Sequence, residues 1–194
     1  MTTPAANTPP PPPYLGSTLA VPDFSSDLWV FGYGSLMWQP GFTFEEVCPA
    51  LLSGWRRSLC IYSWHYRGTE AQPGLVLGLD SGGSCRGMAY RVTAALAEKT
   101  VAYLRERELV SYVYRELLRP VRLSDGRRVP ALTYAADPRH DQYAGALSLE
   151  QRAALVSKAS GIAGANRDYV VNTLTHLEAL GVHDPELAFI VAHP

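Results

Sequence analysis

Near its start the chain has an aromatic and β-branched run that ends in two closely spaced glycines, LWVFGYGSL at residues 28–36. Such side chains favour an extended strand, and the glycines allow a tight turn directly after it. Further strand candidates are mostly bounded by Gly, Pro or Asp, and they span residues 58–63, 75–79, 87–92, 112–118 and 128–135. The middle of the chain is therefore predicted to be mainly β-structure.

A helix is predicted over residues 93–110. Ala97, Val101 and Leu104 recur at spacings of four and three, which places them on one face of a helix. Thr93 is the residue type that caps a helix N-terminus, so we expect it to begin this helix.

Two more helices are expected near the C-terminus. Ser148 and Gln151 have the spacing of a capping box and open the first, while Asn166 is expected to open the second. Gly161 and Gly181 are expected to stop them, because glycine is the usual residue just beyond a helix end.

The chain length favours one domain. A chain of 194 residues, 47% of them hydrophobic, can bury one good core but is short for two full-sized domains. We assign residues 26–194 to this domain. Residues 1–25 include five consecutive prolines, from Pro9 to Pro13, and are predicted to form a disordered Pro-rich tail.

The charge balance bears on the class of partner. Seventeen Lys and Arg residues face eighteen Asp and Glu residues, so the chain has no large excess of one sign to hold a nucleic acid or an anionic membrane. No apolar run approaches the ~20 residues that span a bilayer. We expect a small-molecule partner and no nucleic-acid or membrane partner, in a monomer or a homodimer.

The cysteines and histidines do not have the spacing of a metal site. Cys48, Cys60 and Cys85 contain no CxxC pair, and none of the five histidines lies in an HExxH motif. The residues at the start do not form a secretory signal. We expect reduced core thiols in a cytoplasmic protein that uses no metal and no cofactor.

Glu108 is the acidic residue that says most about function. It lies four residues after Leu104 and extends the apolar face, so its side chain is expected to point inward, whereas Glu106 lies on the opposite face and is expected to be solvated. Burial raises the pKa of a carboxyl and makes it a stronger base near neutral pH. An alternative is that Glu108 forms a buried ion pair with Arg56 or Arg57.

The turn at Gly32, Tyr33, Gly34 and Ser35 is a second candidate site. Glycines allow a backbone path in which successive N–H groups point at a carboxylate or an oxyanion, although the same pattern also occurs in ordinary tight turns. Met37 stands where a dinucleotide motif needs its third glycine, and Ser35 lacks the flanking glycines of a hydrolase nucleophile.

Several segments, taken together, resemble the ChaC family of glutathione-specific γ-glutamyl cyclotransferases. They are VFGYGSLMW at 30–38, GWRR at 54–57, HYRGT at 65–69, PGLVL at 73–77, GMAYRV at 87–92, YLRERE at 103–108 and SGIAGANRDY at 160–169. They occur in the order and the approximate spacing of the family, and the resemblance covers about residues 28 to 190. One departure lies before Tyr112, where many members have two glycines and this chain has Val110 and Ser111.

The resemblance implies an α+β fold of the γ-glutamyl cyclotransferase-like type, a small mixed β-barrel flanked by helices. By position it makes Glu108 the general acid and base of the reaction. It places Tyr169 at the pocket and assigns substrate binding to the loop Gly32, Tyr33, Gly34, Ser35, Leu36 and Met37.

The implied reaction is the conversion of glutathione to 5-oxoproline and Cys-Gly, in which the substrate's α-amine attacks its own γ-carbonyl. Two alternatives stay open. One is a cyclotransferase for other γ-glutamyl amines or amino acids, and the other is a non-catalytic regulatory protein that keeps this fold.

Overall fold

The computed structural model describes residues 22–193, and its centre is a closed five-stranded barrel with the strand order β1-β3-β2-β4-β5. The strands are β1 (Leu28–Gly32), β2 (Glu46–Ser63), β3 (Gly74–Val92), β4 (Tyr114–Leu123) and β5 (Arg128–Ala136). β1 closes the barrel by pairing antiparallel with β3 and parallel with β5. This mixed barrel confirms the predicted fold class.

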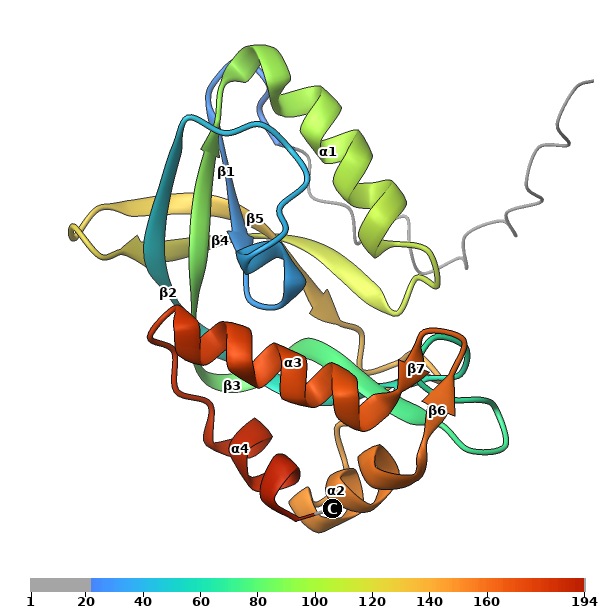
Figure 1. Cartoon of the computed structure of the whole chain (residues 1–194). Helices are drawn as coiled ribbons and strands as arrows, with labels where there is room; N and C mark the ends of the chain where they lie inside the picture. The colour runs from blue at the N-terminus through green and yellow to red at the C-terminus, as the bar shows by residue number, and fades with distance from the viewer. Residues whose placement is uncertain (1–21, 194) are drawn as a thin grey trace, which may run out of the picture.

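Helices pack on two sides of the barrel (Figure 1). They are α1 (Ala94–Glu108), α2 (Leu149–Lys158), α3 (Asn166–Ala179) and α4 (Pro185–Ala192), with the short hairpin β6 (Ser160–Gly161) and β7 (Gly164–Ala165) between α2 and α3. Figure 1 shows α1 along one side of the barrel and α2, α3 and α4 grouped at one end. A short 3₁₀ helix, η2 (Ser35–Met37), follows β1 and lies between α1 and α3.

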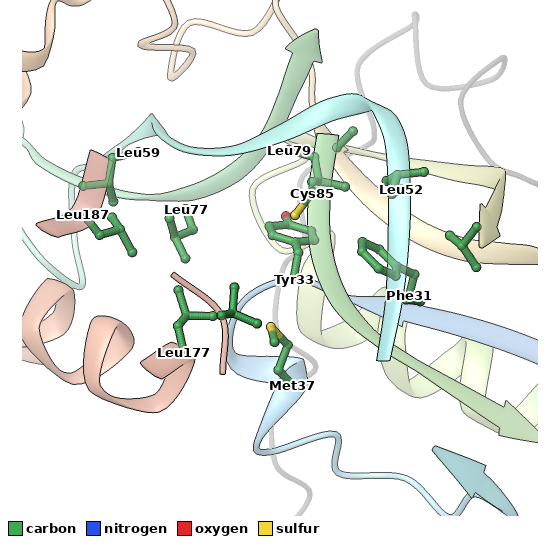
Figure 2. Packing of buried hydrophobic residues seen from close by; sticks show 14 of the residues in the cluster. Phe31, Tyr33, Met37, Leu52, Leu59, Leu77, Leu79, Cys85, Leu177 and Leu187 are labelled. Carbon is green, nitrogen blue, oxygen red and sulfur yellow. The ribbon is translucent and has the colours of Figure 1, made fainter. Parts of the chain in front are cut away.

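Two apolar clusters hold these layers together. The larger one joins the barrel interior to the three C-terminal helices, and Figure 2 shows Phe31 and Leu52 of the barrel in the same cluster as Leu177 and Leu187 of the helices. The smaller cluster packs Ala97, Val101 and Leu104 of α1 against β1, β3 and β5. The apolar face predicted for the first helix is therefore buried as expected.

Two strands are longer than predicted. The candidates 75–79 and 87–92 are parts of one strand, β3, and the candidate 58–63 is only the end of β2. The sequence between them suggested a break because it contains glycines, and two of these, Gly82 and Gly83, have positive φ angles of 92° and 71° in the structure. They lie beside a register shift between Ser53 and Trp55 of β2, and the pairing resumes beyond it. A bulge bends a strand without ending it, which explains the difference.

The first helix begins with a different cap from the predicted one. Thr93 is at the N-cap position but makes no side-chain cap hydrogen bond. Instead the N–H of Ala94 donates to Oδ1 of Asp27 at 3.0 Å. The cap is supplied from a residue distant in sequence, which local sequence patterns do not detect.

Ser148 caps α2 as predicted, in a capping box whose two hydrogen bonds with Gln151 are both present. Gly181 ends α3 as predicted: its N–H donates to Glu178 O at 2.9 Å, and Val182 N–H donates to Leu177 O at 2.8 Å. These two bonds form a Schellman motif around a residue with φ of 70°.

One expectation about the C-terminal helices is wrong, because α2 ends at Lys158, before Gly161, which instead lies in β6. α3 begins at Asn166 as predicted, although the Asn166 side chain bonds to β3 and makes no cap hydrogen bond. The helix α4 was not predicted, although Asp184 caps it by accepting from Leu187 N–H at 3.1 Å and Pro185 is its first residue.

The predicted Pro-rich tail lies almost entirely outside the described residues. Of its last four residues, Phe24 packs against the smaller apolar cluster. The boundary of the domain at residue 26 stays a prediction.

Candidate active site

Glu108 is the last residue of α1, and it is held at a small cavity by the buried face of that helix. Val101 and Leu104 anchor the helix, with at most 1% of their surface exposed. The Glu108 side chain is 19% exposed. Its carboxylate faces the cavity as predicted, whereas Glu106 is exposed.

The cavity has a volume of about 70 Å³ and collects residues from six parts of the chain. Its walls are Tyr33, Gly34, Ser35, Leu36, Leu77, Glu108, Tyr114, Tyr134 and Tyr169. The turn after β1, the end of α1 and the start of α3 thus meet around one space. The carboxylate and the glycine turn, far apart in sequence, are brought together as predicted.

The turn lines this space with residues whose backbone amides are not used by the protein. Within residues 22–193, the peptide N–H groups of Gly34, Ser35 and Leu36 donate to no protein acceptor, because they form the open first turn of η2. Gly32 is needed for close packing, since a Cβ there would lie 2.8 Å from Leu36 Cβ. Gly34 has a negative φ of −129°, and a Cβ there would meet only Leu77 Cδ1 at 3.6 Å.

Two tyrosine hydroxyls bond to the backbone of Leu77 at the cavity wall. Tyr114 donates its hydroxyl proton to Leu77 O at 2.6 Å, and Tyr169 accepts from Leu77 N–H at 3.2 Å. The Tyr114 oxygen therefore keeps lone pairs free to accept, while the Tyr169 hydroxyl keeps its proton free to donate. The two hydroxyls offer a ligand opposite hydrogen-bonding roles.

The tyrosines around the cavity are neutral near physiological pH. Burial raises the pKa values of Tyr33, Tyr114, Tyr134 and Tyr169 above the usual value for tyrosine. The Tyr134 hydroxyl is already used, because it donates to Oε2 of Glu116 at 3.0 Å. The walls are polar but carry no tyrosinate charge.

Burial also raises the pKa of the Glu108 carboxyl above its ordinary value, while the neighbouring Arg107 guanidinium lowers it, and burial is the larger effect. Arg107 Nε lies 3.1 Å from Glu108 Oε1. The alternative partners Arg56 and Arg57 are wrong, because they pair with Asp80 and Asp184.

The predicted loop residues divide into two groups. Tyr33, Gly34, Ser35 and Leu36 line the cavity together with Tyr169, but Gly32 and Met37 do not. The Met37 side chain is buried in the larger apolar cluster, as Figure 2 shows. Its backbone oxygen accepts from the Tyr90 hydroxyl at 2.7 Å.

Sequence reasoning missed three contributors: Arg107, Tyr114 and Tyr134. Arg107 was quoted only as part of a family motif, and both tyrosines fall inside predicted strands. An aromatic residue in a strand is most often a core residue, so nothing local indicated that these hydroxyls meet Glu108.

A larger groove of about 510 Å³ lies elsewhere, between the end of β2 and α2. Tyr62, Trp64 and Leu155 give it a mainly apolar lining, and its acid, Asp141, is exposed. The smaller cavity is the better candidate for chemistry, because a desolvated carboxylate, polar hydroxyls and open amides converge there.

Residues 22–193 show neither a metal-binding cluster nor a membrane-spanning helix. That part of the chain contains no group of three or more His, Cys, Asp or Glu side chains arranged to hold a metal ion. It also has no helix with the length and apolar character needed to cross a bilayer.

Comparisons with known proteins agree with each other. The family described as ChaC-like protein matches residues 28–193. The "Glutathione-specific gamma-glutamylcyclotransferase" of Escherichia coli K12 is 38% identical over 173 residues, which cover 89% of this chain and 75% of that protein. The human "Glutathione-specific gamma-glutamylcyclotransferase 1" is 30% identical, covering 96% of this chain and 88% of the relative.

A crystal structure of a yeast γ-glutamyl cyclotransferase specific to glutathione has the same fold. It superposes with a TM-score of 0.76 at 20% identity, covering 87% of this chain and 95% of the yeast chain.

Proposed function

The chain belongs to the ChaC-like protein family, and from that membership and the cavity at Glu108 we propose that it is a glutathione-specific γ-glutamyl cyclotransferase. It converts glutathione to 5-oxoproline and Cys-Gly. The observation that carries the proposal is the meeting of one desolvated carboxylate with a glycine turn whose amides are open.

The substrate supplies its own nucleophile. Its α-amine attacks the γ-carbonyl carbon and closes a five-membered ring, and the bond from that carbon to the cysteine nitrogen then breaks. Because both reacting groups belong to one molecule, the enzyme gains most by holding them in the cyclising geometry. No covalent enzyme intermediate and no activated water is required.

Glu108 moves the proton. The α-amine is mostly protonated near neutral pH, so the Glu108 carboxylate first takes the ammonium proton and then returns it to the departing Cys-Gly nitrogen. The attacking nitrogen loses a second proton when the ring closes, and this proton also passes to the Cys-Gly nitrogen, which leaves as an ammonium group. A free Glu lies roughly 3.5 pKa units below an α-amine, a mismatch of about 5 kcal/mol. Burial of Glu108 narrows this mismatch, because it raises the pKa of the carboxyl.

The turn and the tyrosines hold the reacting end of the substrate. The open amides of Gly34 and Ser35 stabilise the oxyanion or bind the α-carboxylate, and the loss of one oxyanion donor typically costs about 3–4 kcal/mol. Tyr169 donates a hydrogen bond and Tyr114 accepts one. Tyr33, Leu36 and the flanking Gly32 and Met37 complete the proposed substrate loop.

The size of the cavity agrees with this substrate class. About 70 Å³ is far below the roughly 300–1,000 Å³ of pockets that enclose a drug-sized ligand. We infer that the cavity takes the γ-glutamyl head, while the Cys-Gly part extends outward.

The test uses two neighbouring acids on α1. Purified protein is incubated with glutathione, and 5-oxoproline and Cys-Gly are measured by mass spectrometry. Glu108→Gln keeps the side-chain shape but removes the base, so we expect the rate to fall by at least about 100-fold. Glu106→Gln removes an exposed acid two residues away and is expected to match the wild type.

Near-normal product release by folded Glu108→Gln protein would refute the role of this carboxylate. A wild-type preference for γ-glutamyl-alanine over glutathione would instead support the alternative of a cyclotransferase for other γ-glutamyl compounds. No 5-oxoproline from either substrate would support a non-catalytic protein.

We also propose a cytoplasmic location. Cys48, Cys60 and Cys85 are all unpaired and buried, which suits a reducing compartment.

A further inference from the structure

Arg107 connects the proposed base to the substrate turn through one side chain. Its Nε lies 3.1 Å from Oε1 of Glu108, and its Nη2 donates to Oγ of Ser35 at 2.8 Å. Glu108 ends α1 and Ser35 begins η2, so the guanidinium joins two elements on either side of the cavity. The side chain is 23% exposed, which makes this a partly desolvated contact.

The remaining nitrogen fixes the same side chain to the segment after η2. Nη1 donates to the backbone oxygens of Gln39 at 2.8 Å and Pro40 at 3.3 Å, and to the Tyr103 hydroxyl at 3.0 Å. All three guanidinium nitrogens of Arg107 therefore have acceptors. A lysine would keep the charge but would lack the planar fork that reaches several acceptors at once.

Arg107 also supplies the positive charge beside the base. The titratable groups that face Glu108 from the other packed elements are Tyr33 after β1, Tyr114 on β4, Tyr134 on β5 and Tyr169 on α3. These hydroxyls are neutral near physiological pH. Further charges contact these tyrosines: Glu116, paired with Arg105, accepts from the Tyr134 hydroxyl, and the Arg67 guanidinium lies 5.4 Å from the centre of the Tyr169 ring.

We propose that Arg107 is a positioning residue of the cyclotransferase reaction. Its guanidinium holds the Glu108 carboxylate at a fixed position relative to the Ser35 turn, and its positive charge keeps that carboxylate ionised. The inference rests on the proposed function. Its two parts are separable, because the fork sets the geometry and the charge sets the ionisation of the base.

Two substitutions distinguish these parts. Arg107→Lys keeps the charge and loses the fork, while Arg107→Met loses both. Lys99→Met is the matched control, because Lys99 is an exposed cation on the same helix. For each variant kcat and KM are measured from about pH 5 to pH 9 by 5-oxoproline formation, and folding is checked by circular dichroism.

We expect kcat on the pH-independent plateau to fall about 10- to 100-fold in both Arg107 variants, because misplacing the base relative to the substrate has effects of this size. In Arg107→Met the acid limb of kcat/KM also moves to higher pH, since the charge that favours the carboxylate is gone. In Arg107→Lys the limb stays near that of the wild type. Lys99→Met is expected to change neither quantity.

A purely structural role for Arg107 would lower the yield of folded protein and leave the plateau and the acid limb unchanged per folded molecule. That result would overturn the proposal. If Arg107→Met does not fold, Arg107→Lys decides alone, and a wild-type plateau in this variant would overturn the proposal equally.

A second readout does not depend on turnover. The Glu108 carboxyl is titrated by ¹³C NMR, with its signal assigned from its absence in Glu108→Gln. We expect its midpoint to rise in Arg107→Met, and an unchanged midpoint would refute the electrostatic part. An inactive wild type would refute the proposed function while leaving this titration interpretable.

Discussion

Glu108 and Glu106 lie two residues apart on one helix, yet their side chains meet different environments. Glu108 faces the cavity and Glu106 faces solvent. The desolvation that suits Glu108 to the proposed role of base also makes its ionised form unfavourable for the folded chain. Reactivity and stability therefore oppose each other at this residue.

This opposition predicts how Glu108→Gln affects stability. Because the folded pKa of the carboxyl is raised, ionisation costs stability above that pKa, and the cost disappears as the pH falls below the unfolded value near ~4.3. We expect Glu108→Gln to raise Tm near pH 7.5, by about 2–4 °C for each kcal/mol gained in a chain of this size. The gain is expected to shrink towards pH 4.

Calorimetry of the wild type, Glu108→Gln and Glu106→Gln across this pH range measures the effect. Glu106→Gln is expected to show no pH-dependent change in Tm. A lower Tm for Glu108→Gln near pH 7.5 would mean that the Arg107 contact outweighs the desolvation of the carboxylate.

At the residue scale the sequence predicted the direction of the Glu108 side chain better than the residues around it. The spacing of Ala97, Val101, Leu104 and Glu108 was sufficient to place the carboxylate on the buried side. The role of Tyr114 could not be predicted in the same way, because its hydroxyl bonds to Leu77, a strand residue distant in the chain. Periodicity reports which face of an element is buried but not which element it meets.

Between elements, Asn166 links the first turn of α3 to β3. Its side chain is fully buried and forms two hydrogen bonds with one residue: Nδ2 donates to Leu75 O at 2.7 Å, and Oδ1 accepts from Leu75 N–H at 2.7 Å. These two bonds replace the two backbone hydrogen bonds that a neighbouring strand would make with Leu75. Tyr169 follows three residues later on the same helix, so this contact helps to place its hydroxyl at the cavity.

We predict that Asn166→Ala lowers the free energy of unfolding by about 2–5 kcal/mol, because it leaves the N–H and the oxygen of Leu75 buried without partners. Asn172→Ala, at an exposed position of the same helix, is the matched control. Urea denaturation of the two variants measures the difference. Equal midpoints would show that water replaces the amide without cost.

The ends of elements were predicted where the signal is local. Ser148 with Gln151, and Gly181, act within a few residues of the helix end that each defines. Thr93 was misjudged because a distant residue, Asp27, caps the start of α1. Asn166 begins α3 as predicted, but its side chain bonds to Leu75 on β3 and not to the helix end. A residue type that can cap a helix can also bond elsewhere, and only the packed structure decides between them.

The molecule as a whole is a barrel that helices cover at two places (Figure 1). The cavity is lined by residues from both groups of helices, Glu108 of α1 and Tyr169 of α3. The barrel and its flanking helices were expected from a family resemblance that rests on several motifs spaced along the chain. Local sequence patterns alone did not predict that β1 pairs with both β3 and β5 and so closes the barrel. A short stretch of sequence does not determine which distant strands it pairs with.

Ligand binding is expected to stabilise the whole fold, because the ligand contacts segments from the barrel and from both groups of helices. The Glu108→Gln variant is expected to bind glutathione without turnover, and glutathione at 100 times its Kd then adds about 2.7 kcal/mol to the free energy of unfolding. For a chain of this length that corresponds to a rise in Tm of roughly 5–10 °C.

Cys-Gly at the same concentration is the control, because it lacks the γ-glutamyl head that we place in the cavity. It is expected to raise Tm much less. A shift as large as that with glutathione would mean that the head is not the recognised part.

The residues that line the cavity lie as far apart in the sequence as Tyr33 and Tyr169. A chain that stops before residue 169 therefore lacks part of the site. Breakdown of glutathione would begin only once residues 33 to 169 have all been made and folded, so copies interrupted within this range would be inactive and would not slowly deplete the thiol.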